Sequence, residues 1–299
     1  MSVQWRSGNL PTGHAYRQAG RQASSGRQIF LNQIFMSIRI PAAKNQFYPG
    51  NPQILKQMIM QFFESAEVSK MDEKIKAIIV PHAGYIYSGE VAAYAYELLK
   101  YLDPEKEYKI LLLGPSHQIP FIGAAVSNDN RWETPLGLVN SRDIRAEIKK
   151  SANIVDVFNA HKDEHSLEVQ VPFLQMSLKN FIIYPLCIGD LRSDFLANDL
   201  VDFCKNDDVI TVISTDLSHY LPYEDAKEVD LITSEAIVNV DIDAMIEKGD
   251  ACGRIGVLTG MFLAEKLGWK CKMLKYLNSG DTAGDKSRVV GYGAYVMYE

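Results

Sequence analysis

The chain has 299 residues, of which 47% are hydrophobic and 23% charged, and a formal net charge of −6 at pH 7. This composition suffices for a packed core, and a nucleic-acid surface is not expected because phosphate binding needs clustered Lys and Arg. The four cysteines include no Cys-x-x-Cys pair, and no apolar run approaches the roughly 20 residues of a membrane helix. We therefore expect a cytoplasmic protein with no membrane segment, disulfide scaffold or structural zinc module.

Residues 1–35 differ in composition from the rest of the chain. Their only charged residues are four arginines, and Ser, Gly and Gln are abundant. Such a leader is typical of an organelle transit peptide, but an upstream extension before an alternative start at Met36 explains it as well. In either case we expect residues 1–35 to lie outside the fold and residues 36–299 to form one domain.

From Met36 onward, strand and helix patterns alternate. Asn51 and Pro52 predict a helix start, since an Asn cap followed by Pro suits the first helical turn, and apolar residues recur at helical spacing up to Phe63. This alternation predicts a single-domain α/β sandwich with a largely parallel or mixed central sheet flanked by helices. Strands are expected at 75–80, 110–113, 181–188, 209–213 and 289–298, and further helices near 89–100, 166–178, 193–204, 223–239 and 255–267.

Three of the predicted strands lead into a polar turn that carries a histidine. These histidines are His82, His117 and His219. In sheets of this class, ligands bind outside the carboxyl ends of the strands, so the three imidazoles are expected to meet in one pocket. Histidine is the commonest metal ligand and the usual general base near pH 7. The pattern thus indicates a metal site with a proton carrier beside it.

Cys252 is the fourth candidate, because it precedes an apolar helix and is followed closely by Arg254. The positive end of a helix dipole favours a thiolate, which suits a metal ligand or a nucleophile. The alternative interpretation is a small buried residue in a turn.

Three further residues are candidates for supporting roles. Asp216 lies three residues before His219 and is expected to raise its basicity, although a capping role is equally compatible with the sequence. His165 and Glu168 lie three apart in a predicted helix start and are expected to point together into the pocket and orient a ligand or substrate, unless the acidic residues only cap the helix. His14 and His161 are expected to be incidental.

Several longer motifs resemble those of the Memo-like family, whose bacterial and archaeal members are often called AmmeMemoRadiSam system protein B. The resemblance spans nearly everything after Met36. The matching segments are Gln46–Gly50, Pro81–Gly89, Leu113–His117, Asp163–Gln170, Ser214–Tyr220 and Ala251–Gly253.

The resemblance implies a fold similar to the class III extradiol dioxygenases, which hold Fe(II) with two histidines and a glutamate. The positions that match the Memo-like pattern are His82, His117 and Cys252, so a cysteine stands where those enzymes have a carboxylate. Thiolate shifts the preference toward copper or zinc, and Fe(II) also accepts such ligands. The resemblance implies one metal ion, iron or copper first and zinc as a further option, with His219 in proton transfer.

Two functions follow from this resemblance. The first is a metal-dependent oxidoreductase acting on an unidentified small molecule, and the second is a metal-binding or partner-binding protein without turnover. The family's system name also suggests a functional link to a radical-SAM protein.

Overall fold

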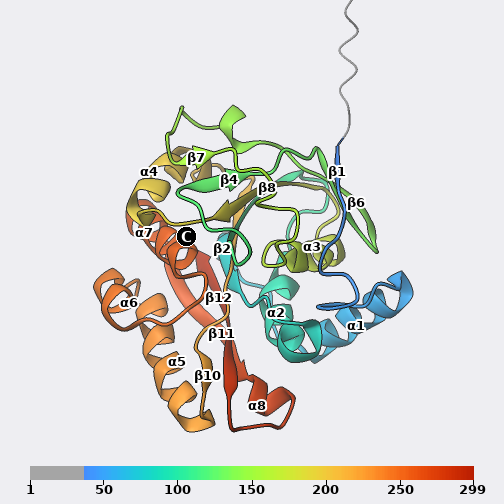
Figure 1. Ribbon diagram of the computed structural model, residues 1–299, viewed down its shortest axis with the longest axis vertical. Helices are drawn as coiled ribbons and strands as arrows, with labels where there is room; N and C mark the ends of the chain where they lie inside the picture. The colour runs from blue at the N-terminus through green and yellow to red at the C-terminus, as the bar shows by residue number, and fades with distance from the viewer. Residues whose placement is uncertain (1–36) are drawn as a thin grey trace, which may run out of the picture. The chain divides into compact units, whose positions relative to one another are not determined.

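The computed structural model describes residues 37–299, and its centre is a nine-stranded mixed sheet (Figure 1). The strand order is β10-β12-β2-β9-β3-β8-β4-β7, with β11 paired to β12. Parallel pairing joins β2, β9, β3 and β8, whereas β12 runs antiparallel to β2. The strands are β2 (Ile75–Val80), β3 (Tyr108–Pro115), β4 (Ala124–Val126), β7 (Ile154–Val155), β8 (Phe181–Ile188), β9 (Val209–Ser214), β10 (His219–Leu221), β11 (Lys270–Asn278) and β12 (Val289–Tyr298).

Helices cover both faces of this sheet. Figure 1 shows α1 (Pro52–Ser65), α2 (Tyr85–Leu99) and α3 (Val171–Ser177) on one side. The other side carries α4 (Ser193–Cys204), α5 (Tyr223–Val238), α6 (Ile242–Lys248) and α7 (Arg254–Leu267). The remaining elements are β1 (Ile38–Arg39), β5 (Arg131–Thr134) and β6 (Gly137–Asn140), which form a small sheet, the 3-10 helices η1 (Ile144–Ala146) and η2 (Glu168–Gln170), and α8 (Ser279–Thr282).

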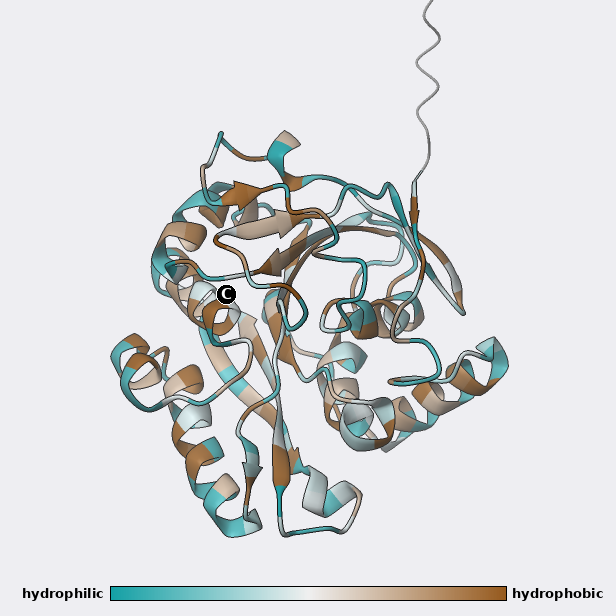
Figure 2. Cartoon of the chain, in the orientation of Figure 1, coloured by the Kyte–Doolittle hydropathy of each residue, from teal (hydrophilic) through white to brown (hydrophobic). Residues whose placement is uncertain are grey.

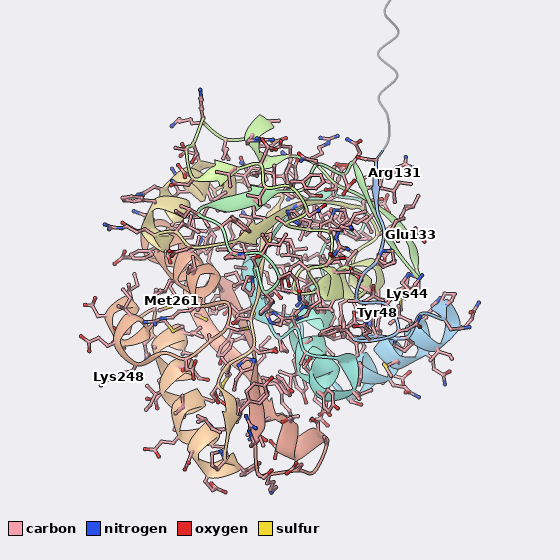
Figure 3. All side chains as sticks on the ribbon, viewed as in Figure 1. Lys44, Tyr48, Arg131, Glu133, Lys248 and Met261 are labelled. Carbon is pink, nitrogen blue, oxygen red and sulfur yellow. The ribbon has the colours of Figure 1, made fainter. Side chains whose placement is uncertain are left out.

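The two helical layers create two apolar cores because side chains alternate between the faces of each strand. In β2, Ile78 and Val80 pack into the core under α1, α2 and α3, while Ala77 and Ile79 pack into the core under α4 to α7. Figure 2 shows the hydrophobic colour concentrated on the central strands and on the inner faces of the helices, and side chains fill the space between the layers (Figure 3). A sheet buried on both faces explains the continuous apolar strand sequences.

The structure confirms the predicted α/β class and several element boundaries. The ranges 75–80, 181–188, 289–298 and 193–204 match β2, β8, β12 and α4. The range 166–178 is not one helix, because residues 165–167 form a turn before η2 and α3. The sequence did not predict β11, whose side chains are partly exposed and include four lysine or asparagine positions, so its apolar pattern is weak.

The sheet register brings three strand ends together. Val80 at the end of β2 pairs with Ser214 at the end of β9, and Leu113 near the end of β3 pairs with Ile213. The turns that follow these strands therefore start from neighbouring positions on one edge of the sheet. Among the helices of residues 37–299, none has the length and apolarity that a bilayer crossing requires.

Candidate functional site

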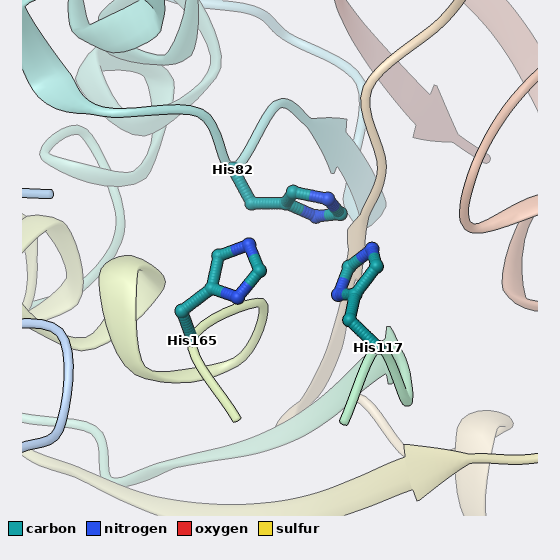
Figure 4. Close-up of side chains that lie close together, drawn as sticks. All are labelled: His82, His117 and His165. Carbon is teal, nitrogen blue, oxygen red and sulfur yellow. The ribbon is translucent and has the colours of Figure 1, made fainter. Parts of the chain in front are cut away.

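Three imidazoles meet at this edge of the sheet. His82 follows β2, His117 follows β3, and His165 lies in the turn before η2. One possible ligand atom from each ring lies within 4.8 Å of those of the other two, and the three rings face a common centre in Figure 4. The ring centroids of His117 and His165 are 4.8 Å apart, and both rings lie edge-on to His82. The ligand atoms lie close enough together for the cluster to hold one metal ion.

Hydrogen bonds around Ser214 determine which nitrogen of His82 carries the proton. The Ser214 hydroxyl donates to the carbonyl oxygen of Ser166 at 2.6 Å, and it accepts from the Gln170 amide at 2.9 Å. Its only proton is therefore used, so the His82 Nδ1, 2.9 Å away, must donate to it. Nε2 of His82 is left with a free lone pair, which is the form that a metal ligand requires.

Glu164 orients the other two rings. Its carboxylate accepts from the His117 Nδ1 at 3.0 Å and lies 3.3 Å from the His165 Nδ1. It also accepts from the backbone amides of His117, His165 and Ser166. These hydrogen bonds, above all those from His117, outweigh burial and hold the pKa of Glu164 down at about 2. The hydrogen bond to Glu164 fixes the His117 ring and leaves its Nε2 free toward the cluster.

Burial keeps His82 and His165 neutral. Removal from water, together with a smaller contribution from the neighbouring imidazoles, lowers the pKa of His82 to about 3 and that of His165 to about 4. At neutral pH these rings present lone pairs rather than charges. Neutral imidazole is the form that binds transition metals.

Cys252 contacts this cluster from the start of α7. Its Sγ lies 3.1 Å from the His82 Nε2 and accepts from the backbone amide of Asp216 at 3.2 Å. The contact depends on Gly253, because a Cβ there would lie 2.6 Å from the carbonyl oxygen of Ser214. The sequence suggested a thiolate at Cys252, but in the protein without a metal ion the thiol form is favoured. Burial outweighs the helix dipole and raises the pKa of Cys252 to about 12. The thiol therefore points its proton at the free nitrogen of His82.

Asp216 and His219 both line the same cavity but are held separately. The Asp216 carboxylate accepts from the backbone amides of His82 and Ala83, at 2.8 and 3.3 Å. The His219 Nδ1 instead lies 2.9 Å from the carbonyl oxygen of Leu217 and donates to it, which leaves its Nε2 free. Asp216 thus braces the turn of His82 rather than sharing a hydrogen bond with His219.

A cavity of about 780 Å³ opens in front of these residues. A second cavity of about 390 Å³ lies beside the start of α7, and Cys252 contributes to the lining of both. Besides the histidines, Asp216 and Cys252, the larger cavity is lined by aromatic residues and by the segment between α8 and β12. Its lining includes Phe47, Tyr87, Tyr220, Asp285, Arg288 and Tyr292.

Glu168 lies outside this cavity. Its carboxylate pairs with the Arg39 guanidinium at 2.5 Å and accepts from the Tyr48 hydroxyl and from the amides of Ala42 and Ala43. Tyr48 is labelled in Figure 3, in the segment that precedes α1. The spacing of His165 and Glu168 therefore does not bring the two together, because residues 165–167 are not helical.

The remaining histidines lie elsewhere. His161 is buried, and its Nε2 lies 2.9 Å from the carbonyl oxygen of Ala125, so it belongs to the packing rather than to a solvated loop. His14 falls outside the described residues.

Three residues of the site were not singled out from the sequence: Glu164, Ser214 and Gln170. Ser214 and Glu164 hydrogen-bond to His82 and His117, and Gln170 acts on His82 through Ser214. Each of these hydrogen bonds joins residues that are far apart in the sequence. They could have been found from the sequence because all three lie in segments that resemble the Memo-like family, Asp163–Gln170 and Ser214–Tyr220, which also contain candidate histidines.

A family model described as Memo-like protein matches residues 39–296. The chain belongs to the Memo-like family. A MEMO1 family protein of Methanosarcina mazei is 36% identical over 278 residues, covering 88% of this chain and 100% of the relative. A MEMO1 family protein of Sulfolobus acidocaldarius is 37% identical over 280 residues, covering 85% and 97%. Another from Aquifex aeolicus is 36% identical over 271 residues, covering 86% and 98%.

These matches confirm the family resemblance drawn from the motifs. The range shared with the Memo-like family contains all of the cluster, Cys252 and His219. The Memo-like chain described here therefore carries its candidate site within the family's own domain.

Proposed function

We propose that this Memo-like protein binds one transition-metal ion and acts as a metal-dependent oxidoreductase on a small molecule. The observation that carries the proposal is the cluster of His82, His117 and His165, in which one ligand atom of each ring lies within 4.8 Å of those of the other two. The Nδ1 atoms of His82 and His117 are hydrogen-bonded to Ser214 and Glu164, which directs the Nε2 atoms of these two rings toward the cluster, as in a metal site. Iron or copper suits the proposal best, with zinc as a further option.

His82 and His117 are the proposed ligands in every version of this site, and Cys252 is the proposed third. The Cys252 Sγ is 3.1 Å from the His82 Nε2, which is within the separation of two ligands on one ion with bonds near 2.0 and 2.3 Å. His165 offers an alternative third ligand, because its ring belongs to the same group. The donor sets differ in softness, since thiolate favours copper or zinc more than imidazole does.

A bound ion of this kind would supply a Lewis acid with open positions for substrate. The surrounding residues have distinct roles in the proposal. His219 presents a free Nε2 to the cavity and would carry a proton, while Asp216 holds the turn of His82 in place. The class III extradiol dioxygenases provide the chemical precedent that the sequence resemblance implies, with ring opening of catechols by dioxygen.

Metal analysis of variants tests the site. We expect full-length protein purified without added metal to hold about one ion per chain, and Cys252→Ser to lose it or bind soft metals more weakly. Cys271→Ser is the matched control, since Cys271 is a buried free thiol in β11. Loss in His165→Ala with retention in Cys252→Ser would assign His165 as the third ligand. Retention of metal in His82→Ala would overturn the proposed site.

The alternative function is a metal-binding or partner-binding protein that turns nothing over. Oxygen uptake with catechols or other reduced aromatic compounds separates the two. Uptake that depends on the metal supports the oxidoreductase. A metal-loaded protein that consumes no oxygen with any of these compounds supports the binding protein.

A further inference from the structure

The lining of the cavity contains a cation with no ionic partner among the described residues. Within residues 37–299, Arg288 forms no ion pair, and its guanidinium instead lies 5.0 Å from the centre of the Tyr220 ring. One carboxylate oxygen of each acidic residue in the cavity is already engaged. Asp216 accepts from the amides of His82 and Ala83, and Asp285 turns back to Ser287, accepting from its amide and hydroxyl. Arg288 is therefore free to bind an anionic ligand.

Tyr220, whose ring forms a cation–π contact with Arg288, has a strained backbone. Its φ is +61°, a left-handed conformation that a bulky residue adopts at a cost of about 1 to 3 kcal/mol. It lies at an irregularity in the pairing of β10 with β12, where His219 pairs with Val290 and Leu221 with Val289. Such irregularities redirect side chains and are frequent beside active sites. Here the result is that both His219 and the successive Tyr220 line the cavity.

The other walls of the cavity are aromatic. Phe47 stacks on His165 with ring centroids 4.2 Å apart, and Tyr87 and Tyr292 also contribute. The ring centroids of His219 and Tyr220 lie 5.7 Å apart in an edge-to-face arrangement, so Tyr220 contacts both Arg288 and the histidine proposed to carry a proton. A volume of about 780 Å³ admits a ring with polar substituents.

We propose that the cavity binds a small aromatic acid, with its carboxylate on Arg288 and its ring between the aromatic walls and the histidine cluster. Guanidinium binds carboxylate through two parallel hydrogen bonds, and Tyr220 holds the guanidinium plane in place by stacking. Arg288 and Tyr220 then select the substrate by its acid group, and the opposite end of the ring reaches the histidines. This assignment deepens the proposed function and rests on it for the reaction, although the binding itself needs no turnover.

Binding of a matched pair of probes tests the proposal. Dissociation constants of 4-hydroxybenzoate and phenol, which differ by the carboxylate alone, are measured by ligand-observed NMR with and without added metal. We expect about tenfold tighter binding of 4-hydroxybenzoate to the wild type, because the carboxylate gains a charge-assisted hydrogen bond at a partly exposed site. Arg288→Gln should abolish this preference and leave phenol binding and metal content unchanged.

Two further variants separate recognition from general effects. Tyr220→Gly removes the ring and the backbone strain together, so it should weaken binding of both probes while the melting temperature stays the same or rises. Lys286→Gln is the charge control, since the Lys286 ammonium lies 4.1 Å from the Tyr223 ring and outside the cavity, and it should change nothing.

Several outcomes would overturn the proposal. These are equal affinity for the two probes in the wild type, no binding of 4-hydroxybenzoate at all, or an equal loss in Lys286→Gln and Arg288→Gln. Inorganic phosphate distinguishes the anion class: phosphate binding that depends on Arg288, without 4-hydroxybenzoate binding, excludes an aromatic acid. The ratio of the two dissociation constants is measured with and without metal. A protein that binds no metal or shows no turnover can therefore still be tested for recognition of the carboxylate.

Discussion

Replacing Glu168 by Gln tests whether this residue acts in the cavity or only holds the chain around it. Gln keeps the shape, but its NH₂ group replaces one carboxylate oxygen and faces two donors instead of accepting from them. One oxygen of Glu168 accepts from Arg39 and Ala42, and the other accepts from Ala43 and Tyr48. The variant therefore loses two hydrogen bonds and leaves the buried Arg39 without its counter-charge.

The contacts that Arg39 retains set the size of the effect. Breaking one side of a buried ion pair costs about 3 to 5 kcal/mol. Arg39 also donates to the carbonyl oxygens of His161 and Glu164, both at 2.7 Å, so we expect the lower end, about 3 kcal/mol. In a domain of this size, about 3 kcal/mol corresponds to a fall in melting temperature of roughly 6 to 12 °C.

Thermal unfolding and metal analysis of the same preparations provide the assay. Glu105→Gln is the control, because its ion pair with Lys179 is exposed and contributes at most about 1 kcal/mol. Glu168→Gln should melt several degrees lower than this control, yet retain metal and activity per folded molecule. An unchanged melting temperature together with lost turnover would refute the reasoning and return Glu168 to a catalytic role.

Three further predictions concern other parts of the chain. His219→Ala should keep its metal while any turnover falls about a hundredfold or more, and loss of the metal would make His219 a ligand. A chain starting at Met36 should melt at the temperature of the full chain, and a fall of several degrees would contradict this. Burial lowers the pKa of His161 to about 4, so its unfolded form, which titrates near 6.5, takes up a proton first and stability falls by about 3 kcal/mol between pH 6.5 and 4. Urea unfolding of His161→Gln at pH 7 and pH 5 should show a smaller loss than the wild type, and an equal loss would exclude His161 from this effect.

The sequence predicted the parts of the fold whose signal is local. Buried strand β8 is a continuous apolar run between turns, β2 is apolar except for Lys76, and α4 has a regular apolar face, so their ends were predicted to the residue. Edge strand β11 and the short α6 lack such a pattern. Their positions depend on partners that are distant in the sequence. Strand β11 pairs with β12 in an antiparallel arrangement, and this pairing provides the backbone hydrogen bonds of a strand that its amino-acid composition does not predict.

The candidate site divides in the same way. His82, His117 and His219 were predicted because each follows a recognisable strand, and parallel strands bring their ends to one edge. His165 and Glu168 were predicted to share one helix face. Because a turn precedes η2, their side chains point in different directions: His165 joins the histidine cluster, and Glu168 forms the ion pair with Arg39.

The state of the site depends on contacts that no local pattern contains. A thiol before a helix suggests an easily ionised Cys252, yet the packing that buries it raises its pKa to about 12. The free Nε2 of His82 likewise results from a chain of donors in which Tyr96 donates to Gln170, Gln170 to Ser214, and Ser214 to a backbone carbonyl. The Ser214 hydroxyl has one proton, which it donates to the backbone carbonyl, so it can only accept a hydrogen bond from the His82 Nδ1. The order of donors and acceptors therefore determines that His82 carries its proton on Nδ1. The residue types of this candidate site can thus be read from the sequence, whereas the positions of their protons are a property of the folded chain.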